Sequence, residues 1–273
     1  APAVLALIQV DSAYGDSEME VMYRGGNRLV RRYTESPGIP SPMVSESTSM
    51  LDGAVVITGG LGGLGLLTAK LLVEMRFARH LVLVSRSGRV SHGGQGLEGD
   101  LEQLQGERTR ALGVSVHVLQ CDVSDERAVV SLLEQVRTEC GNVCGVIHAA
   151  GVLRDGLLRG GAAAKGFDQV WGAKAASAHY LSKHTTGDDL RVFVCFSSIT
   201  AAVGNPGQCA YGAANAFLDG LVEERVARGE CGVSIRWPSV VGVGMAAAGG
   251  IDLDGLSISV EDAKNILRDV VRK

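Results

Sequence analysis

The sequence has no excess of basic residues. Its 26 lysines and arginines are outnumbered by 30 aspartates and glutamates, which gives a formal net charge of −4 and a pI near 5.9. The basic residues are scattered singly rather than gathered into a stripe. Nucleic acids and anionic membranes attract proteins through clustered positive charge. We therefore expect neither of them as a partner.

A hydrophobic run suited to crossing a membrane is also lacking. The uncharged stretch 193–218 is interrupted by polar, Pro and Gly residues at Ser197, Ser198, Asn205, Pro206, Gly207, Gln208 and Asn215. This pattern is typical of a buried strand that leads through a loop into a helix, not of a membrane span. The chain begins Ala1-Pro2, without a basic segment and a hydrophobic stretch, so no secretory signal is expected. We expect a cytoplasmic or organellar stromal location, and a piece of a longer polypeptide.

Metal-binding cysteine patterns are absent as well. Six cysteines occur, at positions 121, 140, 144, 195, 209 and 231. Cys140 and Cys144 lie close in sequence, but neither a second pair nor a histidine cluster at zinc-like spacing accompanies them. The pattern favours free, mostly buried thiols in a reducing compartment and predicts no metal site.

The composition is that of a globular protein, since 46% of the 273 residues are hydrophobic and 21% are charged. Residues 1–35 are expected to form a small unit with a strand at 5–10 and a hairpin at 21–33, which turns at Gly25-Gly26-Asn27. Residues 36–50 contain three prolines and several serines and indicate a linker. The remaining residues, 51–273, are expected to form the main domain.

Strands and helices alternate in this main domain. We expect strands at 54–58, 81–85, 114–122, 143–148, 191–196 and 232–237. The intervening helices are expected at 64–76, 101–112, 124–140, 166–185 and 209–228, with a loop at 86–100. Repeated strand–helix–strand units with continuously apolar strands indicate a parallel sheet covered on both faces. The predicted fold class is therefore α/β, a Rossmann-like doubly wound parallel sheet, with the small N-terminal hairpin beside it.

A glycine-rich turn follows the first of these strands. It reads Thr58-Gly59-Gly60-Leu61-Gly62-Gly63-Leu64-Gly65 and leads directly into a helix. Glycines here allow the backbone to approach a pyrophosphate, whose charge is favoured at the helix N-terminus. A glycine turn without a ligand is the alternative, but the strand–turn–helix context favours a dinucleotide cofactor.

The ends of the next strands carry further cofactor candidates. Ser85-Arg86 occupies the position where NAD-preferring enzymes place a carboxylate, and Arg86 could pair with a 2′-phosphate. This favours NADPH, whereas a solvated surface arginine is the alternative. Asp122, followed by Val123, is placed to bond the adenine amine, or else to cap the helix at Ser124.

The fourth strand ends in His148-Ala149-Ala150-Gly151, whose small residues leave room for the ribose and nicotinamide. We expect His148 to be packed or hydrogen-bonded rather than to act as a base.

A candidate catalytic set lies around one tyrosine. Ser198 precedes Tyr211 by thirteen residues, Asn215 follows it by four, and Lys174 stands upstream. A phenol has a pKa near ~10, and a nearby ammonium lowers it. We expect Tyr211 to donate a proton, Ser198 to hold a carbonyl oxygen and Lys174 to keep the phenol acidic. Singly, Ser198 and Lys174 could be ordinary strand-end and helix-surface residues.

Several motifs together resemble the ketoreductase domain of modular polyketide synthases and, more distantly, of animal-type fatty acid synthases. They are Val56-Ile-Thr-Gly-Gly-Leu-Gly-Gly-Leu-Gly65, His80-Leu-Val-Leu-Val-Ser-Arg86, Cys121-Asp-Val123, His148-Ala-Ala-Gly-Val-Leu153, Phe196-Ser-Ser198, Gly207-Gln-Cys-Ala-Tyr-Gly-Ala-Ala-Asn-Ala-Phe-Leu-Asp219, Trp237-Pro and Gly244-Met-Ala. Most short-chain enzymes place a Lys four residues after the Tyr. In this family Lys and Asn have exchanged places, as Lys174 and Asn215 have here. The resemblance covers roughly residues 20–262.

The resemblance implies an NADPH-dependent reduction of a β-ketoacyl thioester, carried by phosphopantetheine on an acyl carrier protein, within a megasynthase of neighbouring domains. It adds Pro238 and Ser239 to the cofactor site, and it gives Asn215 an ordering role in the catalytic site. It further implies that residues 1–35 end a structural subdomain and that the domain is truncated at the C-terminus, before one more strand.

For the product, the resemblance gives a mixed signal that leans towards the D-hydroxy (B-type) class. Leu153-Arg-Asp155 keeps the second acid of a Leu-Asp-Asp motif, and Pro206 also leans this way. The Trp that marks the opposite class would lie near Val203 and is absent. Together with Gln208, Asp155 and Pro206 are the expected substrate residues, although Asp155 could be a surface acid.

Two rival readings remain open: a stand-alone carbonyl reductase, and a reduction-incompetent structural domain. The Gly- and Ala-rich segment 242–258 is a candidate mobile lid over the substrate.

Overall fold

The computed structural model describes part of the chain: residues 21–24, 27–30, 50–90, 96–157, 162–243 and 257–272. The chain divides into two compact units, Ala1–Ser45 and Glu46–Lys273. In the first unit, β1 (Val21–Arg24) pairs antiparallel with β2 (Asn27–Val30), in a register that sets Arg24 opposite Asn27. The predicted pairing of a hairpin is thus confirmed. The expected strand at 5–10 lies outside the described residues, as does the expected linker at 36–50 except for its last residue.

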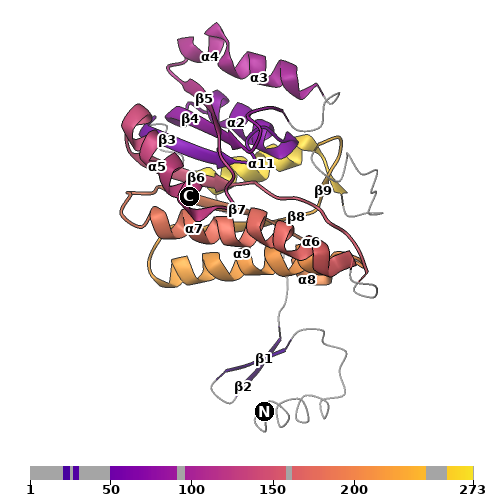
Figure 1. Cartoon of the computed structure of the whole chain (residues 1–273). Coiled ribbons are helices and arrows are strands. Elements are labelled where there is room, and N and C mark those ends of the chain that lie inside the picture. Colours follow the sequence, from indigo (N-terminus) through magenta and orange to yellow (C-terminus); the bar gives the residue numbers. More distant parts are fainter. Residues whose placement is uncertain are drawn as a thin grey trace. The chain divides into compact units, whose positions relative to one another are not determined.

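The second unit contains a six-stranded parallel sheet (Figure 1). Its strands are β3 (Leu51–Thr58), β4 (Ala78–Ser85), β5 (Ser115–Gln120), β6 (Val143–His148), β7 (Val192–Ser198) and β8 (Val233–Trp237). They lie in the order β5-β4-β3-β6-β7-β8. The order reverses between β3 and β6, and ligands of doubly wound sheets bind at the carboxyl ends of the strands beside that point.

Alternate residues of each strand enter the two layers of core. On β3, Val55 and Ile57 pack with Leu66 of α2 (Gly63–Glu74), whereas Ala54 and Val56 pack with Leu133 of α5 (Glu126–Cys140). In the centre of the sheet, residues 54–57 of β3 and residues 82–83 of β4 are fully buried. This two-sided burial is why the strands are continuously apolar in sequence, and it confirms the predicted fold class.

The remaining helices complete these layers. They are α3 (Leu97–Gln105), α4 (Glu107–Ala111), α6 (Ala162–Trp171), the π-helix η1 (Gly172–Ala176), α7 (Ser177–His184), α8 (Thr200–Val203), α9 (Cys209–Ala227) and α11 (Val260–Val271). A short parallel pair, β9 (Ser239–Val240) with β10 (Ser257–Ile258), connects residues before and after the segment 244–256. In Figure 1, α5, α7 and α9 cover one face of the sheet and α2 and α11 the other.

Helix boundaries differ from the sequence expectations by one or two residues in α2 and α9, and more clearly in three other places. The helix expected at 101–112 begins earlier, inside the expected loop 86–100, and breaks at Gly106, whose extended ψ of 172° separates α3 from α4. The start expected at Ser124 lies at Glu126, because the Asp125 side chain accepts a hydrogen bond from Arg127 N and caps the helix. The helix expected at 166–185 spans 162–184 and contains the π-helix η1.

Some elements had no sequence prediction. Helix α11 begins at a capping box, in which Ser259 and Asp262 bond each other's backbone, and its Leu267 is fully buried. The proposed lid 242–258 lies mostly outside the described residues, as does the Gly244-Met-Ala motif. All six cysteines are free, and four of them are buried, as expected, but Cys209 is exposed at the start of α9.

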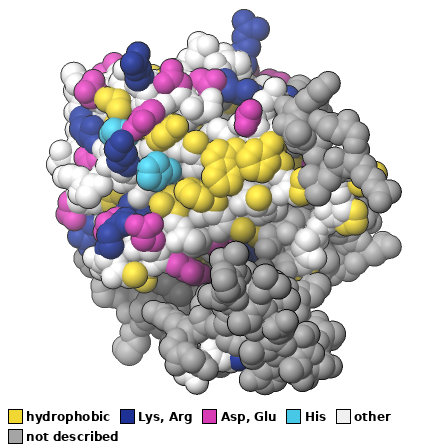
Figure 2. Space-filling view, turned by 60° about the horizontal axis from the view of Figure 1, so that its bottom comes forward, with side chains coloured by type: hydrophobic (Ala, Val, Ile, Leu, Met, Phe, Trp, Pro, Cys, Tyr) yellow, Lys and Arg dark blue, Asp and Glu magenta, His cyan; other side chains and the backbone are white. Residues whose placement is uncertain are grey.

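Three aromatic rings in contact connect α6 to α9, the first pair stacked and the second tilted. The rings of Phe167 and Trp171 lie 5.6 Å apart, and Trp171 and Phe217 lie 5.2 Å apart. On the face that Figure 2 turns forward, apolar side chains form a band bordered by charged ones.

No helix in the described part of the chain combines the length and apolar character that a membrane crossing needs.

Candidate active site

The glycine turn after β3 is packed against itself. Gly59 has φ +65°, and a Cβ on Gly65 would lie 2.3 Å from Gly59 O. Side chains are therefore excluded there by the backbone alone, in addition to any ligand. Gly62 is the N-cap of α2 and makes no side-chain capping bond, so the first N–H groups of this helix have no side-chain acceptor. Free N–H groups at a helix N-terminus suit an anion such as a pyrophosphate.

A cleft with a cavity volume of about 620 Å³ runs along the carboxyl ends of β3, β4 and β5. Its walls include seven of the sequence-predicted cofactor residues: Gly59, Ser85, Arg86, Asp122, Val123, Ala150 and Gly151. Of the glycine turn, only Gly59 is among them. Arg86 is exposed at the cleft, whereas Ser85 accepts a hydrogen bond from Gly88 N through its hydroxyl. The chemistry of these residues fits a nicotinamide dinucleotide cofactor.

Asp122 was expected either to bond the adenine amine or to cap the helix at Ser124. The structure shows a modified form of the second role. Its Oδ1 accepts hydrogen bonds from Ser124 N at 3.1 Å and Ser124 Oγ at 2.7 Å. The carboxylate thereby fixes the turn before α5, while Asp125 caps the helix itself. Asp122 remains exposed and lines the cleft.

His148 belongs to a buried chain of hydrogen bonds, not to the reacting surface. Its Nδ1 lies 2.6 Å from Thr58 Oγ1 and its Nε2 lies 2.9 Å from Lys174 O. Thr58 Oγ1 in turn accepts from Ala150 N at 3.4 Å. Burial lowers the pKa of His148 to about 3, so the imidazole is neutral. The expectation that His148 is hydrogen-bonded is confirmed. This series of hydrogen bonds connects the end of β3 to the π-helix.

Lys174 is buried in that π-helix. A π turn widens the helix and occurs often at functional sites. Its Nζ donates a 2.7 Å hydrogen bond to Phe196 O and lies 5.3 Å from the centroid of the Tyr211 ring. Gly151 makes room for it, since a Cβ there would lie 2.9 Å from Lys174 Cε. Burial lowers the pKa of Lys174 from 10.5 to about 8, which leaves it mostly protonated at pH 7.

Ser198 and Asn215 come from the end of β7 and from α9. Ser198 Oγ is buried and accepts from Thr200 N at 3.2 Å. Asn215 is fully buried, and its Nδ2 donates to Tyr211 O at 2.8 Å, one turn earlier. Asn215 Oδ1 is among the buried polar atoms that have no hydrogen-bond partner in the described structure. A buried acceptor without a hydrogen bond lowers the stability of the fold. This oxygen is therefore suited to accept a hydrogen bond from a water or a bound group.

The pKa of Tyr211 differs from the sequence expectation. Burial raises it above the usual value of 10, and the charge of Asp155 also raises it, while the nearby polar side chains of Asn215 and Ser198 act in the opposite direction. The expected acidification is therefore wrong for this state, because desolvation of the buried phenol dominates. A phenol with a raised pKa is fully protonated at neutral pH, as a proton donor must be.

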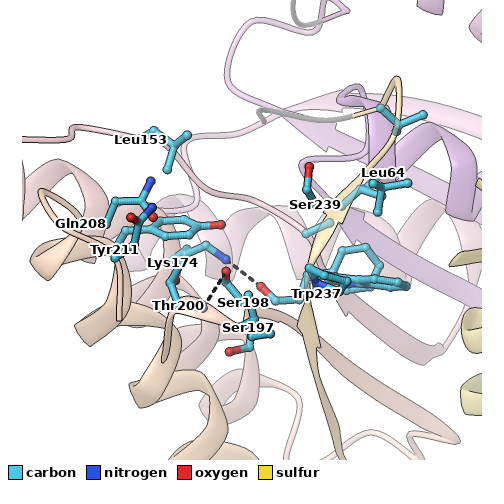
Figure 3. A pocket seen from close by; sticks show the side chains of 17 residues that line it. Leu64, Leu153, Lys174, Ser197, Ser198, Thr200, Gln208, Tyr211, Trp237 and Ser239 are labelled. Carbon is cyan, nitrogen blue, oxygen red and sulfur yellow. Dashed lines mark hydrogen bonds between the residues drawn. The ribbon is translucent and has the colours of Figure 1, made fainter. Parts of the chain in front are cut away.

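Three of the four catalytic candidates border a second, smaller cavity of about 120 Å³, whereas Asn215 is not among its lining residues. Lys174, Ser198 and Tyr211 lie together on one side of it, and Leu64, Trp237 and Ser239 lie on the opposite side (Figure 3). Ala149 and Pro238, also expected at the cofactor site, line it too. Sequence reasoning missed Thr200, whose buried Oγ1 is unpaired; a threonine after the strand-end serines gave no separate signal.

The expected substrate residues are partly brought together. Gln208 Nε2 donates a 2.9 Å hydrogen bond to Asp155 Oδ2, and Gln208 borders the catalytic cavity. Pro206 is exposed and lines neither the cofactor cleft nor the catalytic cavity. Asp155 thus contacts the site through Gln208.

Comparison with known proteins agrees with this geometry. The family model of the KR domain matches residues 53–242. The chain is 44% identical over 188 residues, 69% of its length, to the phenolphthiocerol synthesis polyketide synthase Pks15/1 of Mycobacterium bovis. It is 36% identical over 259 residues, 93% of its length, to polyketide synthase GfsA of Streptomyces halstedii. It spans 8% and 3% of those synthases. A similar Mycobacterium tuberculosis relative carries the word "inactive" in its name.

Solved structures show the same relationship. An A-type ketoreductase from a modular polyketide synthase superposes with a TM-score of 0.76 at 33% identity, over 95% of this chain and 53% of that one. The first-module ketoreductase of phoslactomycin biosynthesis from a Streptomyces species gives a TM-score of 0.75 at 30% identity, over 94% and 57%. The chain belongs to the KR domain family, the ketoreductases of modular polyketide synthases.

Proposed function

We propose that this domain uses NADPH to reduce a β-ketoacyl thioester, carried on an acyl carrier protein, to the β-hydroxyacyl thioester. The observation that carries the proposal is the meeting of Tyr211, Ser198 and Lys174 at one cavity. Three separate elements, α9, β7 and η1, supply these side chains. The cavity adjoins the glycine turn through Leu64 and Ala149, so a reacting carbonyl and a cofactor would meet beside the phenol.

The chain's own groups supply proton transfer and orientation. When bound, NADPH supplies the hydride for the β-carbon. Tyr211, protonated because of its raised pKa, donates its phenolic proton to the carbonyl oxygen. Ser198 donates a hydrogen bond to the same oxygen and strengthens it as negative charge develops there. The Lys174 ammonium, held by Phe196 O, places a positive charge next to the phenolate that forms.

Asn215 completes the proposed proton path. Its Nδ2 is occupied by Tyr211 O, which fixes the side chain in one orientation. Its Oδ1 stays available to a water that could return a proton to Tyr211. Asn215 therefore acts on the position of the phenol and on its reprotonation.

Arg86 supports the choice of NADPH over NADH. It lies exposed at the end of β4, on the cleft that leads from the glycine turn. The equivalent position in NAD-preferring enzymes holds a carboxylate, which would repel a 2′-phosphate. A guanidinium can instead bind such a phosphate through two parallel hydrogen bonds.

The D-hydroxy (B-type) product and the carrier-bound substrate are part of the same proposal. Asp155 supports the D class, and its hydrogen bond to Gln208 holds an acid close to the catalytic cavity. The relatives are large polyketide synthases, which supports an acyl carrier protein and neighbouring domains as partners.

The test is consumption of NADPH and NADH with a β-ketoacyl thioester surrogate, followed by chiral analysis of the product. We expect NADPH-dependent turnover to the D-hydroxy product. An Arg86→Asp variant should weaken NADPH far more than NADH, while Arg89→Asp, an exposed arginine outside the cleft walls, serves as the matched control. Equal use of both cofactors by the wild type would overturn the role of Arg86. Cofactor binding without turnover, even with a carrier-bound substrate, would favour a reduction-incompetent domain.

A further inference from the structure

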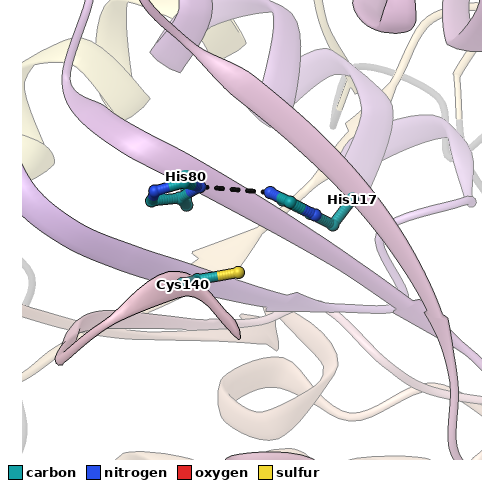
Figure 4. A group of neighbouring side chains, drawn as sticks. All are labelled: His80, His117 and Cys140. Atoms are coloured by element: carbon teal, nitrogen blue, oxygen red, sulfur yellow. Dashed lines mark hydrogen bonds between the residues drawn. The ribbon is translucent and has the colours of Figure 1, made fainter. Parts of the chain in front are cut away.

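Two imidazoles and a thiol meet on the face of the sheet that α5 covers. His80 belongs to β4, His117 to the edge strand β5, and Cys140 is the last residue of α5 (Figure 4). They are separated by 37 and 23 positions in the sequence, so cysteine and histidine spacing gave no signal of them. His80 and His117 lie towards the amino ends of their strands, whereas the active site lies at the carboxyl ends.

The pairing of the sheet explains how they come together. His117 lies opposite Val82, and His80 lies opposite Ser115, so the two histidines are diagonal neighbours on one face. Val82 packs in the same core layer as Cys140. The thiol is buried, and both imidazoles are partly exposed, which leaves an ion a path from solvent.

The distances suit a metal ion. His80 Nδ1 and His117 Nε2 are 3.1 Å apart, and one ligand atom from each of the three residues lies within 4.8 Å of the others. With metal–nitrogen bonds of about 2.0–2.1 Å and metal–sulfur bonds of about 2.3 Å, a tetrahedral zinc ion holds its ligands roughly 3.4–3.6 Å apart. The two nitrogens are already close to that separation. Because the ligand atoms lie up to 4.8 Å apart, the Cys140 thiol would have to move about 1 Å closer to the nitrogens to reach it.

We propose that His80, His117 and Cys140 form a binding site for a zinc-like divalent transition-metal ion. Imidazole and thiolate suit zinc, whereas Mg²⁺ and Ca²⁺ require oxygen ligands. Within the described residues, the cluster contains no carboxylate oxygen. The fourth position is open to water, and the candidate site is empty in this structure.

Binding has a defined proton balance. The Cys140 thiol loses its proton to solvent and bonds the metal as a thiolate. The two nitrogens that now share one hydrogen bond both have to present a lone pair, so the histidine that donates moves its proton to its other ring nitrogen. One proton is therefore released per metal ion bound, without any redox step.

Metal binding at this site would stabilise the edge of the sheet. It joins the edge strand β5, its neighbour β4 and the end of α5, which are otherwise held by strand pairing and apolar packing. A ligand that binds the folded state and not the unfolded state raises stability by mass action. At a hundredfold excess of free metal over Kd, we expect Tm to rise by roughly 5–10 °C.

The experiment is titration of the chelator-treated, reduced, tag-free protein with Zn²⁺ against a chromogenic competitor, with Co²⁺ as a spectroscopic probe. We expect one metal per chain, a tetrahedral cobalt spectrum with a thiolate-to-metal band, and the rise in Tm. His117→Gln and Cys140→Ala should each weaken binding at least tenfold, and Cys140→Ala should abolish the thiolate band. The control Cys209→Ala removes an exposed thiol and should change neither.

Three results would overturn the proposal. They are the absence of stoichiometric binding by the wild type, unchanged binding in His117→Gln with the native circular dichroism spectrum, and loss of the thiolate band in Cys209→Ala. The His117 variant keeps the test decisive where Cys140→Ala disturbs folding, because His117 is partly exposed on an edge strand.

Discussion

Replacing Lys174 with methionine is expected to stabilise the domain near neutral pH while it removes the proposed catalytic cation. Burial lowers the pKa of Lys174 from 10.5 to about 8. Each unit corresponds to about 1.4 kcal/mol, so below pH 8 the buried ammonium costs the folded state about 3 kcal/mol. Loss of its hydrogen bond to Phe196 O offsets about 1.5 kcal/mol of the gain. Lys174→Met should therefore be more stable by about 1.5 kcal/mol at pH 7, as the remainder of these two terms.

The dependence on pH gives the sharper test. Between pH 8 and 10.5 the unfolded chain binds the lysine proton and the folded chain does not, so wild-type stability rises with pH in this window. The advantage of Lys174→Met should shrink by about 3 kcal/mol in total from pH 7 to pH 10.5. This change does not depend on the value assigned to the lost hydrogen bond.

The assay is equilibrium urea unfolding of both proteins at several pH values. Lys183→Met is the control, because it removes an exposed cation whose surface ion pair with Glu126 contributes about 0–1 kcal/mol. A difference in stability between wild type and Lys174→Met that stays constant from pH 7 to pH 10.5 would refute the reasoning that burial penalises this charge.

Three further predictions follow from single contacts. Gly65→Ala places a Cβ 2.3 Å from Gly59 O, and we expect loss of cofactor binding in a fluorescence titration; native affinity would contradict the packing of the turn. Gly151→Ala places a Cβ 2.9 Å from Lys174 Cε, so kcat should fall at least tenfold with little change in KM, and an unchanged kcat would mean that the ammonium is not displaced. Folding lowers the pKa of His148 to about 3, so between pH 6.5 and 4 only the unfolded chain takes up the imidazole proton. As the pH falls through this window, wild type should therefore lose about 1.4 kcal/mol of stability per pH unit more than His148→Gln does. Equal acid sensitivity of the two proteins in urea unfolding would show that the imidazole is not buried in its neutral form.

Strand positions could be predicted because burial on both faces leaves an unmistakable apolar run. Val55 and Val56 face opposite layers and are both fully buried, so the sequence around them contains no polar alternation. The glycine turn was recognisable for a related reason: the backbone excludes any side chain at Gly65. Local chemistry determines both features, and local sequence therefore reveals them.

Features that depend on distant residues could not be predicted in this way. The π-helix places Lys174 by means of contacts from Gly151 and His148, which are more than twenty positions away in the sequence. The direction of the Tyr211 pKa was mistaken because the sequence pairs it with an ammonium but does not show how deeply the phenol is buried. Helix α11 was missed although Ser259 and Asp262 form a capping box there.

The central claim is that Tyr211 donates the proton in carbonyl reduction, and Tyr211→Phe tests it most directly. The measurement is NADPH oxidation with a β-ketoacyl thioester surrogate, together with fluorescence titration of NADPH, for wild type and variant. Removal of the hydroxyl alone leaves the ring beside Lys174, so we predict that NADPH binding changes less than threefold. Turnover should fall by at least about 100-fold, the lower range for loss of a general acid. Turnover by Tyr211→Phe equal to that of the wild type would contradict the account.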